Sequence, residues 1–362
     1  MRKRFELAVL GGLAIAFGIG SRFVPQFPVN LLFSVIYSYP QDQILAKSNL
    51  PRVLPLPLEE ILVRNKGIDS NLSIHFEGNL YAQTPIQEIS GKADKERFQR
   101  VMQDAITQKM YQRPMGEIVQ AIAKQFLGTP YQEDLLDKDK EETLVITLNK
   151  FDCVLFVETV SAMARGVAVQ DYSYETFVAR IRQQRYWNGQ MNGYGSRLHY
   201  FSEWILDNQK RGAVKNIGHE LGGIPLHKKL NFMSQNRQSY PRLVRNDEAY
   251  RRIVEMEDKL DGVAVDYIPT NQIHRAYAQL QPGDIVAVAT NIPGLDVSHT
   301  GLVYRYPDGN IGFIHASPIG QVTIARDLET YVGKVRNAIG ILVTRPIDPR
   351  QKTNQDTTPY HL

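Results

Sequence analysis

The chain has 362 residues, of which 43% are hydrophobic and 22% are charged, and its formal net charge is +4. This composition is typical of a globular protein with one large or two ordinary domains, and it excludes an intrinsically disordered chain. The net charge is small, and no run of Lys and Arg is interleaved with aromatic residues, so nucleic acid is not an expected partner. The single cysteine, Cys153, excludes an intrachain disulfide framework.

The N-terminus has the pattern of an export signal. Residues 1–4 are basic after the initial methionine, and residues 7–17 form an apolar region of signal-peptide length. No Ala-x-Ala cleavage site is clear, and residues 23–39 are also fairly apolar, so an uncleaved membrane anchor stays open beside a cleaved signal. We therefore expect an exported protein, periplasmic or otherwise extracytoplasmic, with residues 1–22 as its signal peptide or anchor.

The rest of the chain divides by its motifs. Residues 23–112 are interpreted as an N-terminal extension of unknown role, with one amphipathic stretch near residues 95–110. A catalytic unit is expected over residues 113–346, and a polar, mobile tail over residues 347–362. The unit opens with residues 115–127, where apolar side chains recur at helical spacing.

Cys153 begins a second predicted helix. Apolar residues follow it at helical spacing, with Asp152 as the N-cap and Gly166 as the expected stop. A cysteine in the first turn lies at the positive end of the helix dipole, which stabilises the thiolate and raises its nucleophilicity. This helix alone leaves open a buried structural cysteine that behaves as a small hydrophobic residue.

Strands dominate the end of the unit, whereas helices dominate its beginning. This segregation predicts an α+β fold. The expected strands cover residues 283–289, 300–306, 311–316 and 340–344.

A tight turn sets the register of the middle two strands. Residues 307–309 read Pro-Asp-Gly, in which Pro and Asp suit the central positions of a type I turn and Gly suits the left-handed position that closes a three-residue hairpin loop. Tyr306 should then face Asn310.

This register brings two histidines together. Counting back from Tyr306 and Asn310 pairs Gly301 with His315, and His299 lies two residues from Gly301 on the same face. The histidines are then diagonal neighbours, about 7–8 Å apart at the backbone, and Gly301 leaves room beside His315. Taken singly, each strand histidine is more often structural. Together with a thiol, one imidazole can take the thiol proton while the other orients the first.

Five short motifs, in this order, resemble those of the NlpC-type cell-wall cysteine peptidases. They are residues 127–131 (Leu-Gly-Thr-Pro-Tyr), 151–153 (Phe-Asp-Cys), 283–285 (Gly-Asp-Ile), 298–304 (Ser-His-Thr-Gly-Leu-Val-Tyr) and 313–317 (Phe-Ile-His-Ala-Ser). The chain is most similar to the N-acetylmuramoyl-L-alanine amidase-like branch, because of an insert containing residues 195–204 and the run 294–299. Two departures from the wider superfamily, Val154-Leu155 after the cysteine and residues 132–134 after Tyr131, fit this branch better.

The resemblance implies a papain-like, NlpC-type fold over roughly residues 114–345, with helices packed on an antiparallel sheet and an enlarged insert. It also implies that Cys153 is the nucleophile, His299 the base and His315 the residue that orients the base. The expected substrate is peptidoglycan or a muropeptide, cut between N-acetylmuramic acid and L-alanine. A γ-D-glutamyl-diamino acid endopeptidase is the runner-up, and a catalytically inactive cell-wall binding module is the alternative from another class.

Further residues are candidates for the oxyanion hole or for substrate contact. Tyr131 is a candidate second oxyanion donor beside the backbone N–H of Cys153, and Arg197 can pair a carboxylate through two bonds. Trp204 suits a stacking face and the hydrophobic core equally. The remaining candidates are Asp152, Tyr200 and Ser298. No metal or other cofactor is expected, since the zinc-protease-like start at residues 219–223 lacks its second histidine.

Overall fold

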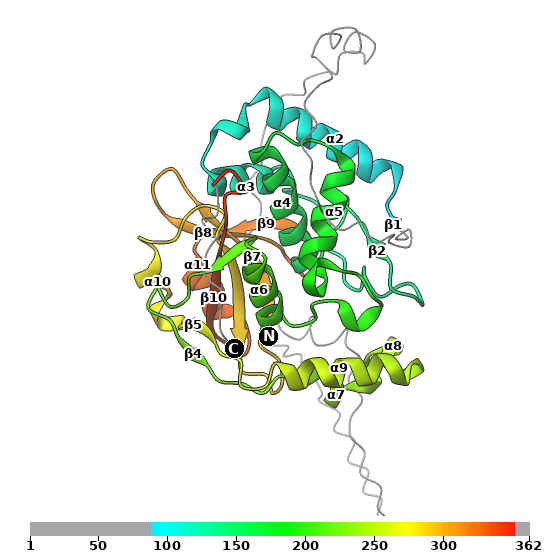
Figure 1. Ribbon diagram of the computed structural model, residues 1–362. Coiled ribbons are helices and arrows are strands. Elements are labelled where there is room, and N and C mark those ends of the chain that lie inside the picture. The colour runs from blue at the N-terminus through cyan, green and yellow to red at the C-terminus, as the bar shows by residue number, and fades with distance from the viewer. Residues whose placement is uncertain (1–87, 352–362) are drawn as a thin grey trace, which may run out of the picture.

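The computed structural model describes residues 88–351 (Figure 1). The predicted signal or anchor over residues 1–22 lies outside these residues, as do most of the expected extension and the end of the tail. Within residues 88–351, no helix has the length and apolarity needed to cross a membrane. The described part is an α+β structure in which helices pack on an antiparallel sheet, so the predicted fold class is confirmed at this level.

An eight-stranded sheet forms the centre of the molecule. Its order is β4-β5-β10-β6-β7-β8-β9, with β3 paired to β10 beside this path, and its pairings are antiparallel. The strands are β3 (Val214–Asn216), β4 (Ile224–Leu226), β5 (Val265–Pro269), β6 (Ile285–Thr290), β7 (Val297–Arg305), β8 (Ile311–Ala316), β9 (Val322–Ala325) and β10 (Ala338–Pro346). A short parallel pair, β1 (Glu88–Ile89) and β2 (Leu144–Val145), lies apart from it. The four predicted strands correspond to β6, β7, β8 and β10.

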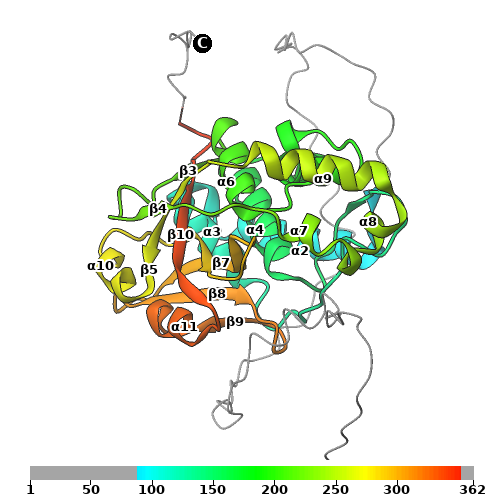
Figure 2. The same cartoon turned by 90° about the horizontal axis from the view of Figure 1, so that it is seen from below.

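Helices cover both faces of this sheet. They are α2 (Lys92–Thr107), α3 (Met115–Lys124), α4 (Cys153–Ala168), α5 (Tyr174–Arg185), α6 (Phe201–Lys210), α7 (Phe232–Gln235), α8 (Pro241–Arg245), α9 (Asp247–Lys259), α10 (Ile273–Ala276) and α11 (Leu328–Lys334). Figure 2 shows α4 and its neighbours on one side of the sheet and α10 and α11 on the other.

Strand β6 explains the two layers. All six of its residues are buried, and successive side chains of a strand point to opposite faces. Ile285 and Ala287 pack in the core cluster of α3 and α4, whereas Val286 and Val288 pack in the cluster of α11. The sheet is therefore a two-sided core, and α4 lies directly on one of its faces.

The core continues across the expected boundary at residue 113. Helix α2, which covers most of the amphipathic stretch near residues 95–110, contributes Phe98 to the cluster that includes α4. The Phe98 ring packs 4.9 Å from the ring of Phe177 on α5, centroid to centroid. At the other end, Ile347 donates a backbone hydrogen bond to Ala213, and the Arg350 guanidinium donates to the carbonyl of Arg113. The described part of the tail is thus bonded to the body of the protein.

The predicted hairpin register is confirmed. The N–H of Tyr306 donates to the carbonyl of Asn310 at 2.9 Å, and Gly309 has φ +85°. Strand β7 pairs Leu302 with Ile314, and this register continued by one residue sets Gly301 opposite His315.

Candidate functional site

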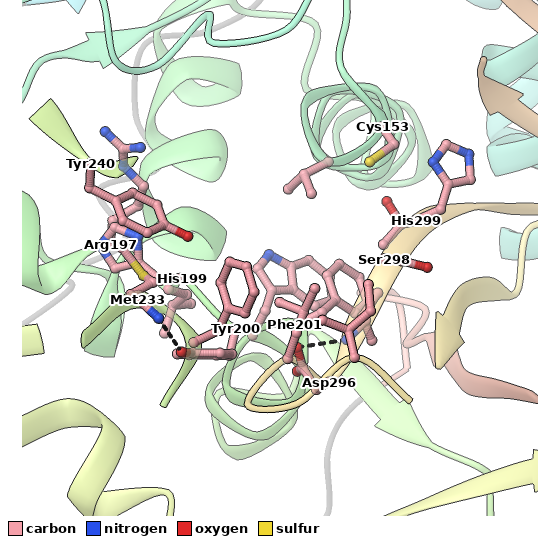
Figure 3. A pocket seen from close by; sticks show the side chains of 18 of the residues that line it. Cys153, Arg197, His199, Tyr200, Phe201, Met233, Tyr240, Asp296, Ser298 and His299 are labelled. Atoms are coloured by element: carbon pink, nitrogen blue, oxygen red, sulfur yellow. Dashed lines mark hydrogen bonds between the residues drawn. The ribbon is translucent and has the colours of Figure 1, made fainter. Parts of the chain in front are cut away.

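A pocket of about 230 Å³ opens beside the first turn of α4. Its walls come from α4, from the start of β7 and from the insert between α5 and α9. Figure 3 shows Cys153 and His299 at one end of the pocket and Arg197 and Tyr240 at the opposite end. The thiol of Cys153 and the imidazole of His299 therefore share a pocket that has aromatic walls.

Asp152 caps the helix that presents the thiol, as predicted. Its Oδ1 accepts the backbone N–H of Leu155 at 2.7 Å, which satisfies one of the free donors of the first turn. The predicted stop at Gly166 is wrong, because α4 continues to Ala168. The glycine permits close packing instead: a Cβ at position 166 would lie 2.7 Å from the carbonyl oxygen of Asp171.

The thiol of Cys153 is protonated in the free protein. Burial, followed by the negative charge of Asp152, raises its pKa to about 12, although contacts with Thr300 lower it. The side chain is only 7% exposed. The prediction of a thiolate held by the helix dipole is therefore wrong, because removal from water outweighs the dipole.

The two histidines meet as the register predicts. His299 Nε2 and His315 Nδ1 lie 2.8 Å apart, with the rings perpendicular, and each side chain is 1% exposed. Burial lowers the pKa of His299 to about 3 and holds the pKa of His315 well below its usual range, so both imidazoles are neutral. Gly301 does leave room here, but the edge of the Phe313 ring occupies it, since a Cβ would lie 2.6 Å from two ring carbons.

A neutral thiol and a neutral imidazole in one pocket can still carry out nucleophilic chemistry. His299 can accept the thiol proton as the sulfur attacks, and the second imidazole can hold the ring of the first in place. If Nε2 of His299 carries the proton and donates to His315, its Nδ1 is the atom that can accept.

Arg197 lines the pocket, but its partners belong to the chain itself. Its Nε and Nη2 donate to the two carboxylate oxygens of Glu142 at 2.9 and 2.7 Å. A further donor bonds Asp137 at 3.1 Å. These carboxylates hold the pKa of the buried guanidinium well above its usual range. The guanidinium that the sequence analysis expects to pair a substrate carboxylate is therefore already bonded to carboxylates of the protein itself.

The aromatic candidates are both core and pocket residues. The Tyr200 hydroxyl donates to Glu257 at 2.7 Å, and the Trp204 indole donates to Glu158 at 3.3 Å and stacks on Phe201. Both side chains are buried, and both line the pocket. The two interpretations of Trp204 are thus compatible.

Of the other predicted residues, some line the pocket and some do not. Ser298 lines the pocket, and its buried hydroxyl has no hydrogen-bond partner among the described residues. Tyr131 is not among the lining residues, and it forms a bridge with Phe151, two residues before Cys153. Asp152 directly precedes Cys153 and is partly buried, and this removal from water raises its pKa to about 6.

The sequence reasoning missed several polar residues of the pocket, including the following three. Asp296 accepts the backbone N–H of Ser202 at 2.7 Å and so ties the start of β7 to the start of α6. His199 bonds the carbonyl of Tyr194 at 2.8 Å. The third residue is Thr300. Strand alternation could have found Thr300, because it lies on the same face of β7 as Ser298; nothing local marks Asp296 or His199.

Comparison with known proteins identifies relatives of this site. A family model described as "AmiA-like: N-acetylmuramoyl-L-alanine amidase-like" matches residues 121–341, more than half of the chain. These residues include Cys153, His299 and His315. No curated protein matches the chain.

Solved structures agree with this match. An N-acetylmuramoyl-L-alanine amidase from Bacteroides uniformis is 28% identical, with a TM-score of 0.59, over 64% of this chain and 99% of that one. A Bacteroides fragilis protein, described only provisionally as a xylanase, is 30% identical, with a TM-score of 0.55, over 62% of this chain and 98% of its own. A Legionella pneumophila protein is 20% identical over 70% of this chain and 96% of its own, with a TM-score of 0.53, and shares the fold.

Proposed function

From the premise that the chain belongs to the N-acetylmuramoyl-L-alanine amidase-like family, we propose that it is a cysteine-dependent amidase of peptidoglycan or muropeptides. The bond cut is the amide between N-acetylmuramic acid and L-alanine. One observation supports cysteine catalysis above all: Cys153 begins α4 in the same pocket as His299, which is hydrogen-bonded to His315. By the same reasoning, the fold belongs to the papain-like, NlpC-type superfamily.

The first step starts from a neutral pair. As the sulfur of Cys153 attacks the amide carbonyl carbon, the thiol proton passes to Nδ1 of His299, and the carbonyl electron pair moves to oxygen. The Cys153 backbone N–H, at the open end of α4, is a donor for that oxygen. His315 stabilises the imidazolium, because the bond at Nε2 becomes charge-assisted.

The second step regenerates the free enzyme. The C–N bond breaks, the leaving amine of L-alanine takes the proton from His299, and a thioester remains on Cys153. A water molecule, activated by His299, then hydrolyses the thioester and restores the thiol.

A glycosidase is less consistent with this pocket. Such enzymes need two carboxyl groups on either side of the glycosidic bond, roughly 5–10 Å apart. The carboxylates that line the pocket are Asp137 and Asp296. Asp137 pairs with Arg197, and Asp296 accepts two backbone N–H groups, so each already has an internal partner.

The proposal includes export of the protein from the cytoplasm. A wall substrate requires an extracytoplasmic location, and the basic and apolar N-terminus is suited to one as a signal or an anchor. Fractionation of cells that express the full chain tests this point: recovery in the cytoplasmic fraction would reject it, and release from membranes by alkaline wash would favour a cleaved signal.

Product analysis tests the activity. The wild type and the Cys153→Ala and His299→Ala variants are incubated with N-acetylmuramoyl-L-alanine and with a full disaccharide-peptide, and products are identified by mass. Ser161→Ala, a buried substitution on α4 away from the pocket lining, serves as the matched control. With the wild type and the control only, we expect N-acetylmuramic acid and free L-alanine from the first substrate, and the disaccharide and a peptide that begins with L-alanine from the second. Cleavage after D-glutamate would indicate the endopeptidase, and no cleavage would indicate a binding module.

A further inference from the structure

Thr300 carries a buried hydroxyl that the mechanism above does not use. Its side chain is 1% exposed, and within residues 88–351 its Oγ1 makes no hydrogen bond of ordinary geometry but lies against the sulfur of Cys153. Buried hydroxyls usually find a partner, because the loss of water is otherwise uncompensated. A buried hydroxyl whose contact is a thiol, a weak acceptor, therefore needs a physical explanation.

The strand directs this hydroxyl toward the nucleophile. Side chains alternate along β7, and Leu302 packs in the core cluster of α4, so Thr300 faces α4 as well. Thr300 and Cys153 line the same pocket. Both the hydroxyl and the backbone N–H of Thr300 lie against the sulfur and lower the pKa of the thiol.

We propose that the hydroxyl of Thr300 donates a hydrogen bond to the sulfur of Cys153 when the thiol loses its proton, which makes Thr300 a catalytic residue of the proposed amidase. The inference rests on the proposed function for its role in turnover, but the hydrogen bond itself does not depend on the substrate. In this step the proton moves from Sγ to Nδ1 of His299, and the electron pair stays on sulfur. The hydroxyl hydrogen turns toward that pair.

The position suits this task. A thiolate formed in a buried site has little water to stabilise it, and hydrogen bonds to charged groups are roughly twice as strong as neutral ones. Because Oγ1 has no other partner among the described residues, its hydrogen can turn without breaking an existing bond. The neutral thiol makes a weak acceptor, so the donor is available when charge develops.

Alkylation of the thiol tests the bond directly. Cys153 is the only cysteine, so iodoacetamide reports on it without background. We compare the wild type with Thr300→Val, which removes the hydroxyl at nearly constant shape, and with Thr300→Ser, which keeps it. Thr344→Val is the matched control, since Thr344 is buried on β10 and its hydroxyl also has no partner in the described structure. Thr344 is not a pocket-lining residue.

Between pH 6 and 9 we expect Thr300→Val to react about tenfold more slowly than the wild type, because loss of a hydrogen bond to the thiolate raises the thiol pKa. Thr300→Ser should stay within about twofold of the wild type, and Thr344→Val should not change. Equal rates for Thr300→Val and Thr344→Val would overturn the proposal, and so would a Thr300→Ser variant as slow as Thr300→Val.

Turnover separates this inference from the proposed function. On N-acetylmuramoyl-L-alanine, Thr300→Val should lower kcat about tenfold with little change in KM, because the bond strengthens only as the thiolate forms. An unchanged kcat would refute the catalytic role. A wild type that fails to cleave the substrate but shows the expected alkylation pattern would reject the amidase and leave the hydrogen bond supported.

Discussion

The buried ion pair of Glu158 and Arg185 allows a measurement of what holds α4 in place. Glu158, in the second turn of α4, accepts Nε of Arg185 at 2.8 Å and the indole N–H of Trp204 at 3.3 Å. The two charged side chains are only 1% and 3% exposed. Glu158→Gln keeps the volume and removes the charge, so it leaves the Arg185 cation buried without a counter-ion. We expect the free energy of unfolding to fall by about 3–5 kcal/mol.

An exposed pair with a similar N–O distance supplies the control. Glu248 and Arg252 lie 2.7 Å apart at successive turns of α9, with 65% and 44% of their side chains exposed. Glu248→Gln should cost less than about 0.5 kcal/mol, since solvent already screens this pair.

Urea unfolding of the wild type, Glu158→Gln and Glu248→Gln measures both losses of stability. In thermal unfolding, the midpoint temperature of Glu158→Gln should lie roughly 6–10 °C below that of the wild type, at about 2 °C per kcal/mol for a chain of this size. The double variant Glu158→Leu/Arg185→Met should recover most of the loss, because it removes both charges. Equal losses for Glu158→Gln and Glu248→Gln would refute the reasoning, since distance alone would then decide the energy and burial would not.

Three more predictions concern protonation and orientation. Because burial raises the pKa of Cys153 to about 12, its alkylation rate should rise about tenfold per pH unit up to pH 10; a plateau near pH 8.5 would contradict this. His315→Ala should lower kcat about 10- to 100-fold with KM within twofold, because the base loses the bond that orients it; an unchanged kcat would show that the bond is dispensable. Burial lowers the pKa of His199 to about 4 in the folded protein, whereas the unfolded chain binds a proton at His199 near pH 6.5. The free energy of unfolding should therefore decrease as the pH falls from about 6.5 towards 4. Denaturant unfolding at pH 7 and pH 5 should therefore show a larger loss for the wild type than for His199→Gln, by about 1.4 kcal/mol per pH unit, and equal losses would exclude His199 as the cause.

Local chemistry explains what could be predicted without coordinates. The N-cap at Asp152, the turn at residues 307–309 and the approach of His299 to His315 depend on short-range geometry: a side-chain acceptor three residues before its donor, a glycine at positive φ, and the two-residue period of a strand. The predicted end of α4 at Gly166 was wrong, because the end of this helix depends on tertiary packing. Gly166 continues the helix because a neighbouring segment packs against it.

Tertiary contacts decided the rest of the site. Arg197 meets Glu142, 55 residues away, and Asp296 meets Ser202, 94 residues away, so neither partner can be deduced from spacing. The protonation of Cys153 depends on how much water the fold removes, and this burial outweighs the helix dipole that the sequence suggests. By itself, then, the sequence determined which residues carry the chemistry and which of them share a strand face, because these follow from periodicity. Only the folded chain decided which of them is charged, which already has a partner within the protein, and which, like Thr300, has a hydroxyl available to the nucleophile. These properties depend on burial and on contacts between distant segments.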